Sequence, residues 1–240
     1  MQKHFVNFKN FEKIKKNRNL EIKLKKKLDT CVQEKLIKSF SQKYKYSYKN
    51  INFKKYNNFK NINLIGMGGS ALGAKAIYNF FSPKIKKKFT FVDNINLKKN
   101  YNQNLKPLNL VISKSGNTLE TISNFKSLKN KKNNLFICEN SNNQIRNLAK
   151  KLKSDIIDHR NYIGGRYSVL SEVGMLPALL MGLNPKKFKR FDNLIKNKRF
   201  INSLISNVIS TVALIRKKKY NSIVLNFDEN SEGLFHWYQQ

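Results

Sequence analysis

The sequence predicts an α/β fold: a doubly wound, mostly parallel sheet flanked by helices. From Ile62 onward, short apolar runs alternate with amphipathic segments, as strands and helices do in a parallel sheet. Two of these runs end in turns rich in glycine or hydroxyl groups, at 66–70 and 113–118, and each turn leads into a helical pattern. Because ligands of such sheets bind beyond the carboxyl ends of the strands, we expect both turns to face one site.

The segment before the sheet has two parts. Residues 1–40 are highly charged and carry apolar residues at broadly helical spacing, which predicts a charged helical segment. In 41–60, tyrosines and phenylalanines alternate with lysines. We expect this part to be a linker whose aromatic rings pack on the domain that follows, and a segment that stacks on RNA bases is the alternative.

The elements of the sheet are expected in a regular order. Strands are predicted at 62–65, 89–93, 108–113, 135–138 and 155–157. Helices are predicted between them at 70–81, 118–129 and 141–153. After the sheet, the pattern predicts helices at 171–182 and 201–216, a strand at 222–225, and the start of an amphipathic helix in 231–240.

The composition indicates a folded rather than a disordered chain, because 40% of the residues are hydrophobic and 12% are aromatic. A formal net charge of +34 would ordinarily indicate a nucleic-acid or anionic-surface partner. Here the lysines are spread along the whole chain among asparagines and isoleucines, as an AT-rich coding bias produces. We therefore expect no nucleic-acid partner, although the charge would help an anionic substrate to approach.

Cysteine usage and apolar runs suggest where the protein resides. Cys31 and Cys138 are far apart and make no disulfide framework, which favours a reducing, intracellular setting. The N-terminal segment has no apolar core of a secretory signal, and the longest apolar run, 173–183, contains Pro177 and is too short to span a bilayer. We expect a cytoplasmic protein without a membrane partner.

The first turn has the features of a phosphate-binding loop. It joins the apolar run 62–65 to a helical pattern that starts at Ala71, and Ser70 stands where a helix N-cap is expected. Glycines let the backbone come close to a ligand, and free N–H groups at a helix start favour an anion. The glycines of this turn are Gly66, Gly68 and Gly69. A turn that needs glycine only for tight packing is the alternative.

The second turn offers hydroxyl groups at the end of an apolar strand. Ser113, Ser115 and Thr118 surround Gly116, and a helix is expected to start at Thr118. Three hydroxyls with backbone N–H groups suit a phosphate monoester, whose three oxygens need many donors. Lys114 adds a positive charge, and Glu120 could hold that lysine in place.

An NAD-dependent oxidoreductase is the alternative from another class. Gly66-x-Gly68-x-x-Ala71 also fits the dinucleotide fingerprint, and Asp93 ends the next strand roughly where a ribose-binding acid belongs. The hydroxyl-rich second turn weakens this alternative, because a dinucleotide fold does not need such a turn and a sugar phosphate does.

A third segment, 161–177, places Arg166 behind Gly164 and Gly165 and ahead of a helix. Its glycine-glycine-arginine-tyrosine-serine run, followed by serine-x-valine-glycine, resembles the signature of the glucose-6-phosphate isomerase family. The GMGGSALG and SKSGNTLET turns resemble the phosphosugar-binding loops of that family's sugar isomerase (SIS) domain, and the order and spacing of all three segments agree. The resemblance covers about 60–240.

The resemblance implies an aldose–ketose isomerase that interconverts glucose 6-phosphate and fructose 6-phosphate through a cis-enediolate, without a metal or other cofactor. Arg166 would stabilise the negative charge of the intermediate. The hydroxyls of the second turn would hold the phosphate, and the first turn would line the sugar. The implied substrate-binding residues are Gly69, Ser70, Ser113, Lys114, Ser115, Thr118 and Gly165.

The family's general base is a glutamate that follows a pair of glutamines. Gln239 and Gln240 match these glutamines and are the last residues of the sequence, so we interpret the chain as a C-terminally truncated fragment that lacks the base. We expect it to bind phosphosugar weakly and to turn over little. Glu120 and Glu172 are not expected to take over this role, and the three histidines are expected at the surface or in packing.

The resemblance also implies a division of the chain. Residues 1–60 would be the charged segment and linker, 61–185 the first SIS domain, and 186–240 a helical connection and the beginning of a second, incomplete SIS domain. A homodimer is expected for the full-length family. A non-catalytic phosphosugar-binding protein is a further alternative. A sensor of this kind that binds DNA would need a DNA-binding segment, and residues 1–60 show no helix-turn-helix pattern.

Overall fold

The computed structural model describes residues 18–95, 106–217 and 229–240, so the strand predicted at 222–225 lies outside the described residues. The chain divides into two units: 1–44 with 189–226, and 45–188 with 227–240. Residues 45–60 thus belong to the unit that contains the sheet. The predicted start of a second domain after 185 stays a prediction.

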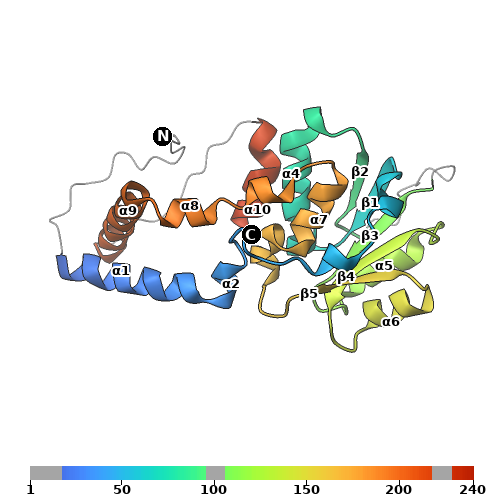
Figure 1. The fold of residues 1–240 in the computed structure, drawn as a ribbon, viewed down its shortest axis with the longest axis horizontal. Helices are drawn as coiled ribbons and strands as arrows, with labels where there is room; N and C mark the ends of the chain where they lie inside the picture. The colour runs from blue at the N-terminus through green and yellow to red at the C-terminus, as the bar shows by residue number, and fades with distance from the viewer. Residues whose placement is uncertain (1–17, 96–105, 218–228) are drawn as a thin grey trace. The chain divides into compact units, whose positions relative to one another are not determined.

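The sheet has five parallel strands in the order β2-β1-β3-β4-β5 (Figure 1). The strands are β1 (Asn61–Ile65), β2 (Lys88–Val92), β3 (Leu108–Ile112), β4 (Asn134–Glu139) and β5 (Asp155–His159). Each agrees with its predicted range to within two residues at either end. The predicted parallel α/β sheet is therefore confirmed.

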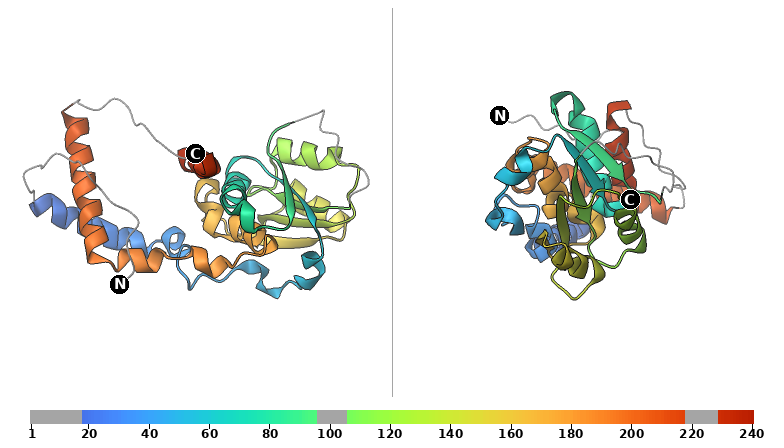
Figure 2. Two further views of the ribbon diagram at one scale, coloured as in Figure 1. Left: turned by 90° about the horizontal axis from the view of Figure 1, so that it is seen from above. Right: turned by 90° about the vertical axis from the view of Figure 1, so that its right-hand side faces the viewer.

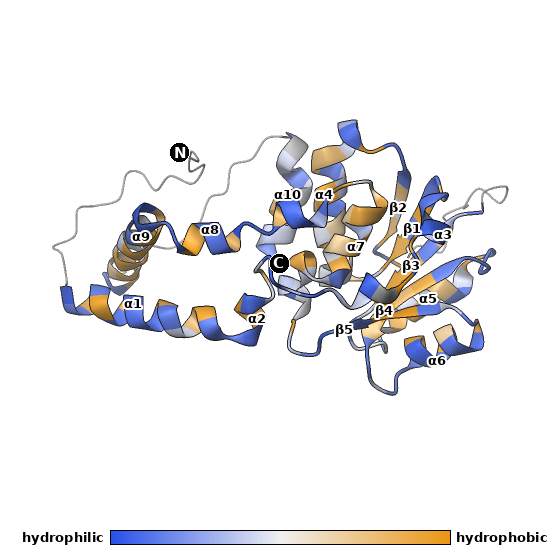
Figure 3. Cartoon of the chain, viewed as in Figure 1, coloured by the Kyte–Doolittle hydropathy of each residue, from blue (hydrophilic) through white to orange (hydrophobic). Residues whose placement is uncertain are grey.

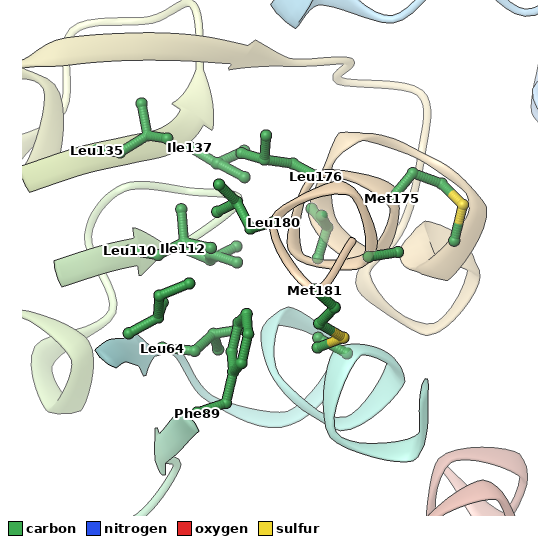
Figure 4. Packing of buried hydrophobic residues seen from close by; sticks show 14 of the residues in the cluster. Leu64, Phe89, Leu110, Ile112, Leu135, Ile137, Met175, Leu176, Leu180 and Met181 are labelled. Carbon is green, nitrogen blue, oxygen red and sulfur yellow. The ribbon is translucent and has the colours of Figure 1, made fainter. Parts of the chain in front are cut away.

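Helices cover both faces of the sheet. Successive side chains of a strand point to opposite faces, so the apolar strands contribute to one core on each side of the sheet. On one face, α4 (Leu72–Phe81) and α7 (Glu172–Leu180) enclose a core in which Leu110, Ile137 and Leu176 meet (Figure 4). On the other face, Val111 and Phe136 belong to a second core with α5 (Leu119–Ser127) and α6 (Gln144–Lys151). All five residues of β3 are buried, as expected for a strand covered on both faces. Figure 3 shows the matching apolar character of α7 and of the central strands.

The last described helix, α10 (Glu232–Gln239), lies along α4, as both views of Figure 2 allow the reader to follow. Gly233 is buried in this contact, and a Cβ at that position would lie 3.2 Å from the Cα of Ala76. The absence of a side chain at Gly233 therefore lets the two helices approach closely. This packing fixes where the C-terminal end of α10 lies relative to the first glycine turn.

A ladder of three buried asparagines crosses the middle of the sheet. The Nδ2 of Asn63 donates to the Oδ1 of Asn109 (3.1 Å), and the Nδ2 of Asn109 donates to the Oδ1 of Asn134 (3.1 Å). The Nδ2 of Asn134 in turn donates to the carbonyl of Lys131 (2.7 Å). The three residues are direct neighbours in the registers of β1, β3 and β4. Since a shift by one residue would turn an amide to the other face, the ladder favours a single register.

Residues 45–60 pack on the sheet unit through their aromatic rings, as predicted for the linker. Tyr48 and Tyr56 are 5% exposed and belong to the same core as Leu108. The segment forms η1 (Ser47–Asn50) and α3 (Lys54–Asn57). Rings buried in this way are not available to stack on nucleic-acid bases, so the structure does not favour the RNA-binding alternative.

Replacing Tyr56 by phenylalanine is expected to destabilise the sheet unit by about 1 kcal/mol at pH 7, because the Tyr56 hydroxyl donates to Asp155 at 2.8 Å. Burial raises the pKa of Asp155, but hydrogen bonds from Lys55 and Tyr56 and the charge of Lys55 outweigh it and lower that pKa below its usual 3.8. This stabilisation is therefore complete above about pH 4 and is lost as the pH falls through the lowered pKa. Urea unfolding of both proteins at pH 7 and pH 3 measures the difference, and the exposed Tyr238→Phe serves as the control. An equal effect of Tyr56→Phe at both pH values would contradict the expectation.

The other unit is helical within its described residues, with α1 (Arg18–Gln33), α2 (Lys35–Lys38), α8 (Phe191–Ile195) and α9 (Lys198–Arg216). Lys189 is buried there, and its Nζ donates to the carbonyl of Ser39 (2.6 Å) and lies 4.1 Å from the ring centre of Tyr44. The helix predicted in 1–40 is confirmed for its described part. Within the described ranges, no helix combines the length and the apolar character needed to cross a membrane.

Candidate phosphosugar site

The three turns singled out in the sequence follow the carboxyl ends of β1, β3 and β5. The first two turns are neighbours because β1 pairs with β3. A Cβ on Gly66 would lie only 2.9 Å from the carbonyl oxygen of Ile112, the last residue of β3. The third turn reaches the first directly, since a Cβ on Gly69 would fall on the carbonyl group of Gly165. The expectation that the first two turns face one site agrees with this arrangement.

The contact between the first and third turns is held by Ser168, which is buried. Its hydroxyl donates to the carbonyl of Gly165 (2.7 Å) and lies 3.1 Å from the carbonyl oxygen of Gly69. Ser168 was not singled out from the sequence, although it is the serine of the glycine-glycine-arginine-tyrosine-serine run. Arg166, in the 3₁₀ helix η4 (Gly165–Leu170), is exposed beside this contact.

Ser70 does not cap a helix as predicted. The helix α4 begins at Leu72, its N-cap residue is Ala71, and no side chain caps it. Ser70 instead belongs to the short 3₁₀ helix η2 (Gly68–Ser70), where its N–H donates to the carbonyl of Met67 at 3.0 Å. Gly68, the first residue of η2, takes a positive φ of +50°, a conformation that glycine adopts without strain.

The second turn brings two of its three hydroxyls together. The Oγ of Ser113 lies 2.9 Å from the Oγ1 of Thr118 and accepts from the N–H of Gly116 at 3.2 Å. Ser113 is buried, whereas Ser115 is exposed and accepts from the N–H of Asn117 (3.3 Å). The helix α5 starts directly after Thr118, as expected. The binding of phosphate by these hydroxyls stays a prediction.

The second turn is braced by the N-terminal end of α6, which the sequence did not reveal. The carbonyl of Gly116 accepts from the N–H of Ile145 (2.9 Å), and the Oδ1 of Asn117 accepts from the N–H of Gln144 (3.0 Å). Gly116 has a φ of +68°, and Asn143 fills the space where its Cβ would lie. Asn143, almost fully buried, caps α6 by accepting from the N–H of Arg146 (2.8 Å).

Replacing Asn143 by alanine is expected to cost about 1 kcal/mol of stability, because the cap of α6 is lost. It should also weaken phosphate binding, because the turn around Gly116 loses the side chain packed against it. The matched control is Asn197→Ala, which removes the equivalent cap of α9 in the other unit, where Asn197 accepts from the N–H of Phe200 at 2.9 Å. Thermal unfolding and phosphate titration of both variants measure the two effects. Equal loss of phosphate affinity in both would contradict the expectation.

The expected partner of Lys114 was wrong. Its Nζ lies 3.5 Å from the Oε1 of Glu139, and not beside Glu120, which lies in the first turn of α5. Glu139 ends β4, the neighbour of β3, and its N–H also donates to the carbonyl of Lys114 (3.0 Å). The register of two adjacent strands therefore sets this ion pair, and nearness along the chain does not.

Three other residues bear on the site and on its alternatives. The side chain of Gln240 lies at the first turn, because a Cβ on Gly68 would be 2.6 Å from its Nε2. Asp93, the acid of the oxidoreductase alternative, forms an ion pair with Lys75 of α4 at 2.8 Å. His236 is exposed and lies 3.5 Å from Glu232, as expected for a surface residue, and His4 lies outside the described residues.

The chain matches the family model described as phosphoglucose isomerase over residues 26–239. A glucose-6-phosphate isomerase of Methanocaldococcus jannaschii is 30% identical over 206 residues, which are 78% of this chain and 51% of that protein. A probable glucose-6-phosphate isomerase of Methanococcus maripaludis is 31% identical over 205 residues, 76% of this chain and 47% of that protein. The chain thus spans about half the length of these curated relatives.

Among solved structures, a hypothetical protein of Thermus thermophilus has the same fold, with a TM-score of 0.63 and 18% identity over 92% of this chain and 58% of that one. This likeness supports the arrangement of the sheet and its helices. The family model covers most of the chain, and it includes all three turns that meet at the edge of the sheet. The chain belongs to the phosphoglucose isomerase family.

Proposed function

We propose that the protein interconverts glucose 6-phosphate and fructose 6-phosphate, and that this chain supplies the phosphate-binding turns and the cation of the site. The observation that supports this most is the meeting of three motif-bearing turns at one edge of the sheet, where Gly165 lies against Gly69 and Arg166 is exposed beside them. The proposal is consistent with membership of the phosphoglucose isomerase family. No described feature favours the oxidoreductase alternative.

The second turn would bind the phosphate group. The hydroxyls of Ser115 and Thr118, together with the N–H groups of the turn and of the start of α5, would donate to phosphate oxygens. Ser113 would support the turn from below through Thr118 and Gly116. Lys114 would add its positive charge to the phosphate site. Its Nζ lies 3.5 Å from Glu139, which is a loose ion pair, and its side chain is about one-third exposed, so a phosphate could still reach it.

Arg166 would act on the reacting carbons. Isomerisation removes a proton from the carbon beside the carbonyl, and the electron pair moves toward the carbonyl oxygen to give a cis-enediolate. A fixed guanidinium beside that oxygen stabilises the developing charge. The reaction also needs a general base, and we assign it to no described residue. Glu172 is unsuited because it is fully buried and accepts from the N–H of Ser47 at 3.0 Å.

Fructose 6-phosphate is expected to raise the melting temperature of the 240-residue chain, whereas NAD is not. A phosphorylated sugar acid serves as the second ligand, because its carboxylate mimics the charge of the enediolate. Arg166→Ala is expected to weaken its binding by about tenfold or more, since a hydrogen bond to a charged group contributes about 1.5–3 kcal/mol. The control is Arg160→Ala, which removes an exposed arginine of the same segment. Stabilisation by NAD alone, or equal loss of affinity in both variants, would contradict the proposal.

The homodimer expected for the full-length family stays a prediction, and so does the cytoplasmic location. Analytical ultracentrifugation of the chain with and without fructose 6-phosphate would test the first of these.

A further inference from the structure

Two buried ionisable side chains lie at the two ends of the arginine turn. His159 is the last residue of β5 and Glu172 is the first residue of α7, so the segment between them contains Arg166. Their side chains are 1% and 0% exposed, and the Nδ1 of His159 lies 3.9 Å from the Oε2 of Glu172. Neither residue has a part in the binding or chemistry proposed above.

Each member of the pair is also anchored to the backbone. The Nε2 of His159 lies 3.1 Å from the carbonyl oxygen of Ile163. Because a carbonyl oxygen only accepts, Nε2 carries the proton, and the Nδ1 of the neutral ring is then an acceptor. This Nδ1 has no hydrogen-bond partner among the described residues. Glu172 accepts from the N–H of Ser47 through its other oxygen (3.0 Å), which ties the turn to the segment 45–50.

The anchored carbonyl stands directly before the glycines that carry Arg166. Ile163 is fully buried, and its N–H donates to the carbonyl of Arg160 at 3.1 Å, which closes a tight turn. After Ile163, Gly164 and Gly165 give the chain two flexible positions in succession, so the placement of Arg166 depends on how firmly the preceding residue is held. On the far side, the hydroxyl of Ser171 donates to the carbonyl of Ser168 (2.6 Å), and Glu172 follows.

We propose that His159 and Glu172 are positioning residues that together hold the turn 160–171 so that Arg166 faces the substrate. This rests on the proposed function of Arg166. His159 fixes the chain before the glycine pair and Glu172 fixes it where α7 begins, and the two side chains face each other in the core between these points. A carboxylate is well placed at Glu172, because the N-terminal end of a helix favours negative charge.

The charge state of the pair follows from the groups around it. Burial is the main effect and lowers the pKa of His159, and the charge of Lys114 lowers it further. The hydrogen bond with the Ile163 carbonyl and the charges of Glu172 and Glu139 raise this pKa, but the net shift is downward. These groups face the ring from α7 and from the ends of β4 and β3. The ring is therefore neutral at pH 7. Because the folded pKa is lowered, the stabilisation by the neutral ring is complete above the usual 6.5 and is lost as the pH falls below it.

The test uses the full 240-residue chain and compares His159→Leu with His159→Gln. Glutamine keeps an N–H that can reach the Ile163 carbonyl, whereas leucine does not. We expect His159→Leu to speed amide hydrogen exchange at Ile163 and Tyr167, because the N–H groups of these residues close the turn. We also expect it to weaken binding of the phosphorylated sugar acid on the order of tenfold. Affinity for inorganic phosphate should stay unchanged, and His159→Gln should restore both properties in large part. The control is His236→Leu at an exposed site.

The ring nitrogens of His159 provide a second measurement. Their ¹⁵N shifts in the unmodified chain should show a protonated Nε2 and a bare Nδ1 at pH 7, and a doubly protonated or Nδ1–H ring would overturn the assignment. If His159→Leu does not fold, Glu172→Gln provides the test, because glutamine keeps an acceptor for the N–H of Ser47. It should still change the ¹⁵N shifts of His159 and the amide exchange at Ile163. If neither the shifts nor the exchange rate changed, the proposal would be overturned.

The outcomes separate this proposal from the proposed function. Variants that lower the melting temperature but leave turn exchange and sugar-acid affinity as in the unmodified chain would reduce the pair to a stabilising role and overturn the proposal. If the unmodified chain itself binds no sugar acid, the proposed function fails, and exchange at Ile163 and Tyr167 still decides whether the pair holds the turn.

Discussion

Gly69→Ala is expected to destabilise the sheet unit by about 3 kcal/mol and to weaken phosphosugar binding by about tenfold or more. The added methyl group would fall on the carbonyl group of Gly165, which is backbone and cannot rotate away as a flexible side chain does. The two turns would have to separate, and Ser168, which bonds across their contact, would lose part of its hydrogen bonding. Urea unfolding and calorimetric titration with fructose 6-phosphate measure the two effects.

Gly164→Ala is the matched control, because it adds the same methyl group in the same region. A Cβ there would meet only a ring carbon of Tyr167 at 3.7 Å, an ordinary van der Waals distance. Its φ of −67° and ψ of 154° are accessible to alanine. We therefore expect stability and affinity close to those of the unmodified chain. If Gly69→Ala behaved like Gly164→Ala, the close contact of the two turns would be refuted.

Asn109→Leu is expected to destabilise the sheet unit by about 2–4 kcal/mol, since it leaves the side-chain amides of Asn63 and Asn134 and the carbonyl of Asn130 without this partner. Asn109 is fully buried at the centre of the ladder, where it accepts from Asn63 and donates to Asn134. It also lies 2.9 Å from the carbonyl of Asn130, to which its Nδ2 donates. Leucine has a similar size but offers neither group. The free energy of unfolding from urea titrations measures the loss.

Two further variants make this prediction specific. Asn57→Leu introduces the same change at an exposed position of α3 and is expected to alter stability by less than about 0.5 kcal/mol. Replacing all three ladder asparagines by leucine removes donors and acceptors together and should recover much of the loss, because paired removal of polar groups is far less costly than leaving one unpaired. If the triple variant lost as much stability relative to the unmodified chain as the three single variants lose together, the asparagines would act independently and the prediction would be refuted.

Much of the site could be predicted from the sequence because its signals are local. Glycine at 66, 68, 69 and 116, hydroxyls after an apolar run, and an arginine after paired glycines each depend on neighbours along the chain. Gly68 and Gly116 have positive φ in the structure, a backbone conformation that glycine adopts without strain. The helix start at Ser70 was misplaced because a short 3₁₀ helix precedes α4 there, and nothing in the local pattern distinguishes the two kinds of helix start.

The partners within the site could not be predicted in the same way. Closeness in sequence predicts Glu120 as the partner of Lys114, yet Glu139 reaches Lys114 from the adjacent strand. The contact of Gly69 with Gly165, the ladder through Asn109, and the facing of His159 and Glu172 likewise join segments that are far apart in the chain or buried between layers.

The sequence by itself determined the order of strands and helices, the three turns and the types of residue they carry, and the family to which the chain belongs. Apolar periodicity and turn residues act over a few residues, and a single chain displays them directly. The tertiary structure decided which turn lies against which, and which charges pair. These contacts depend on the strand order β2-β1-β3-β4-β5 and on the register within it, which result from the packing of the whole sheet and its helices and are not contained in any local pattern.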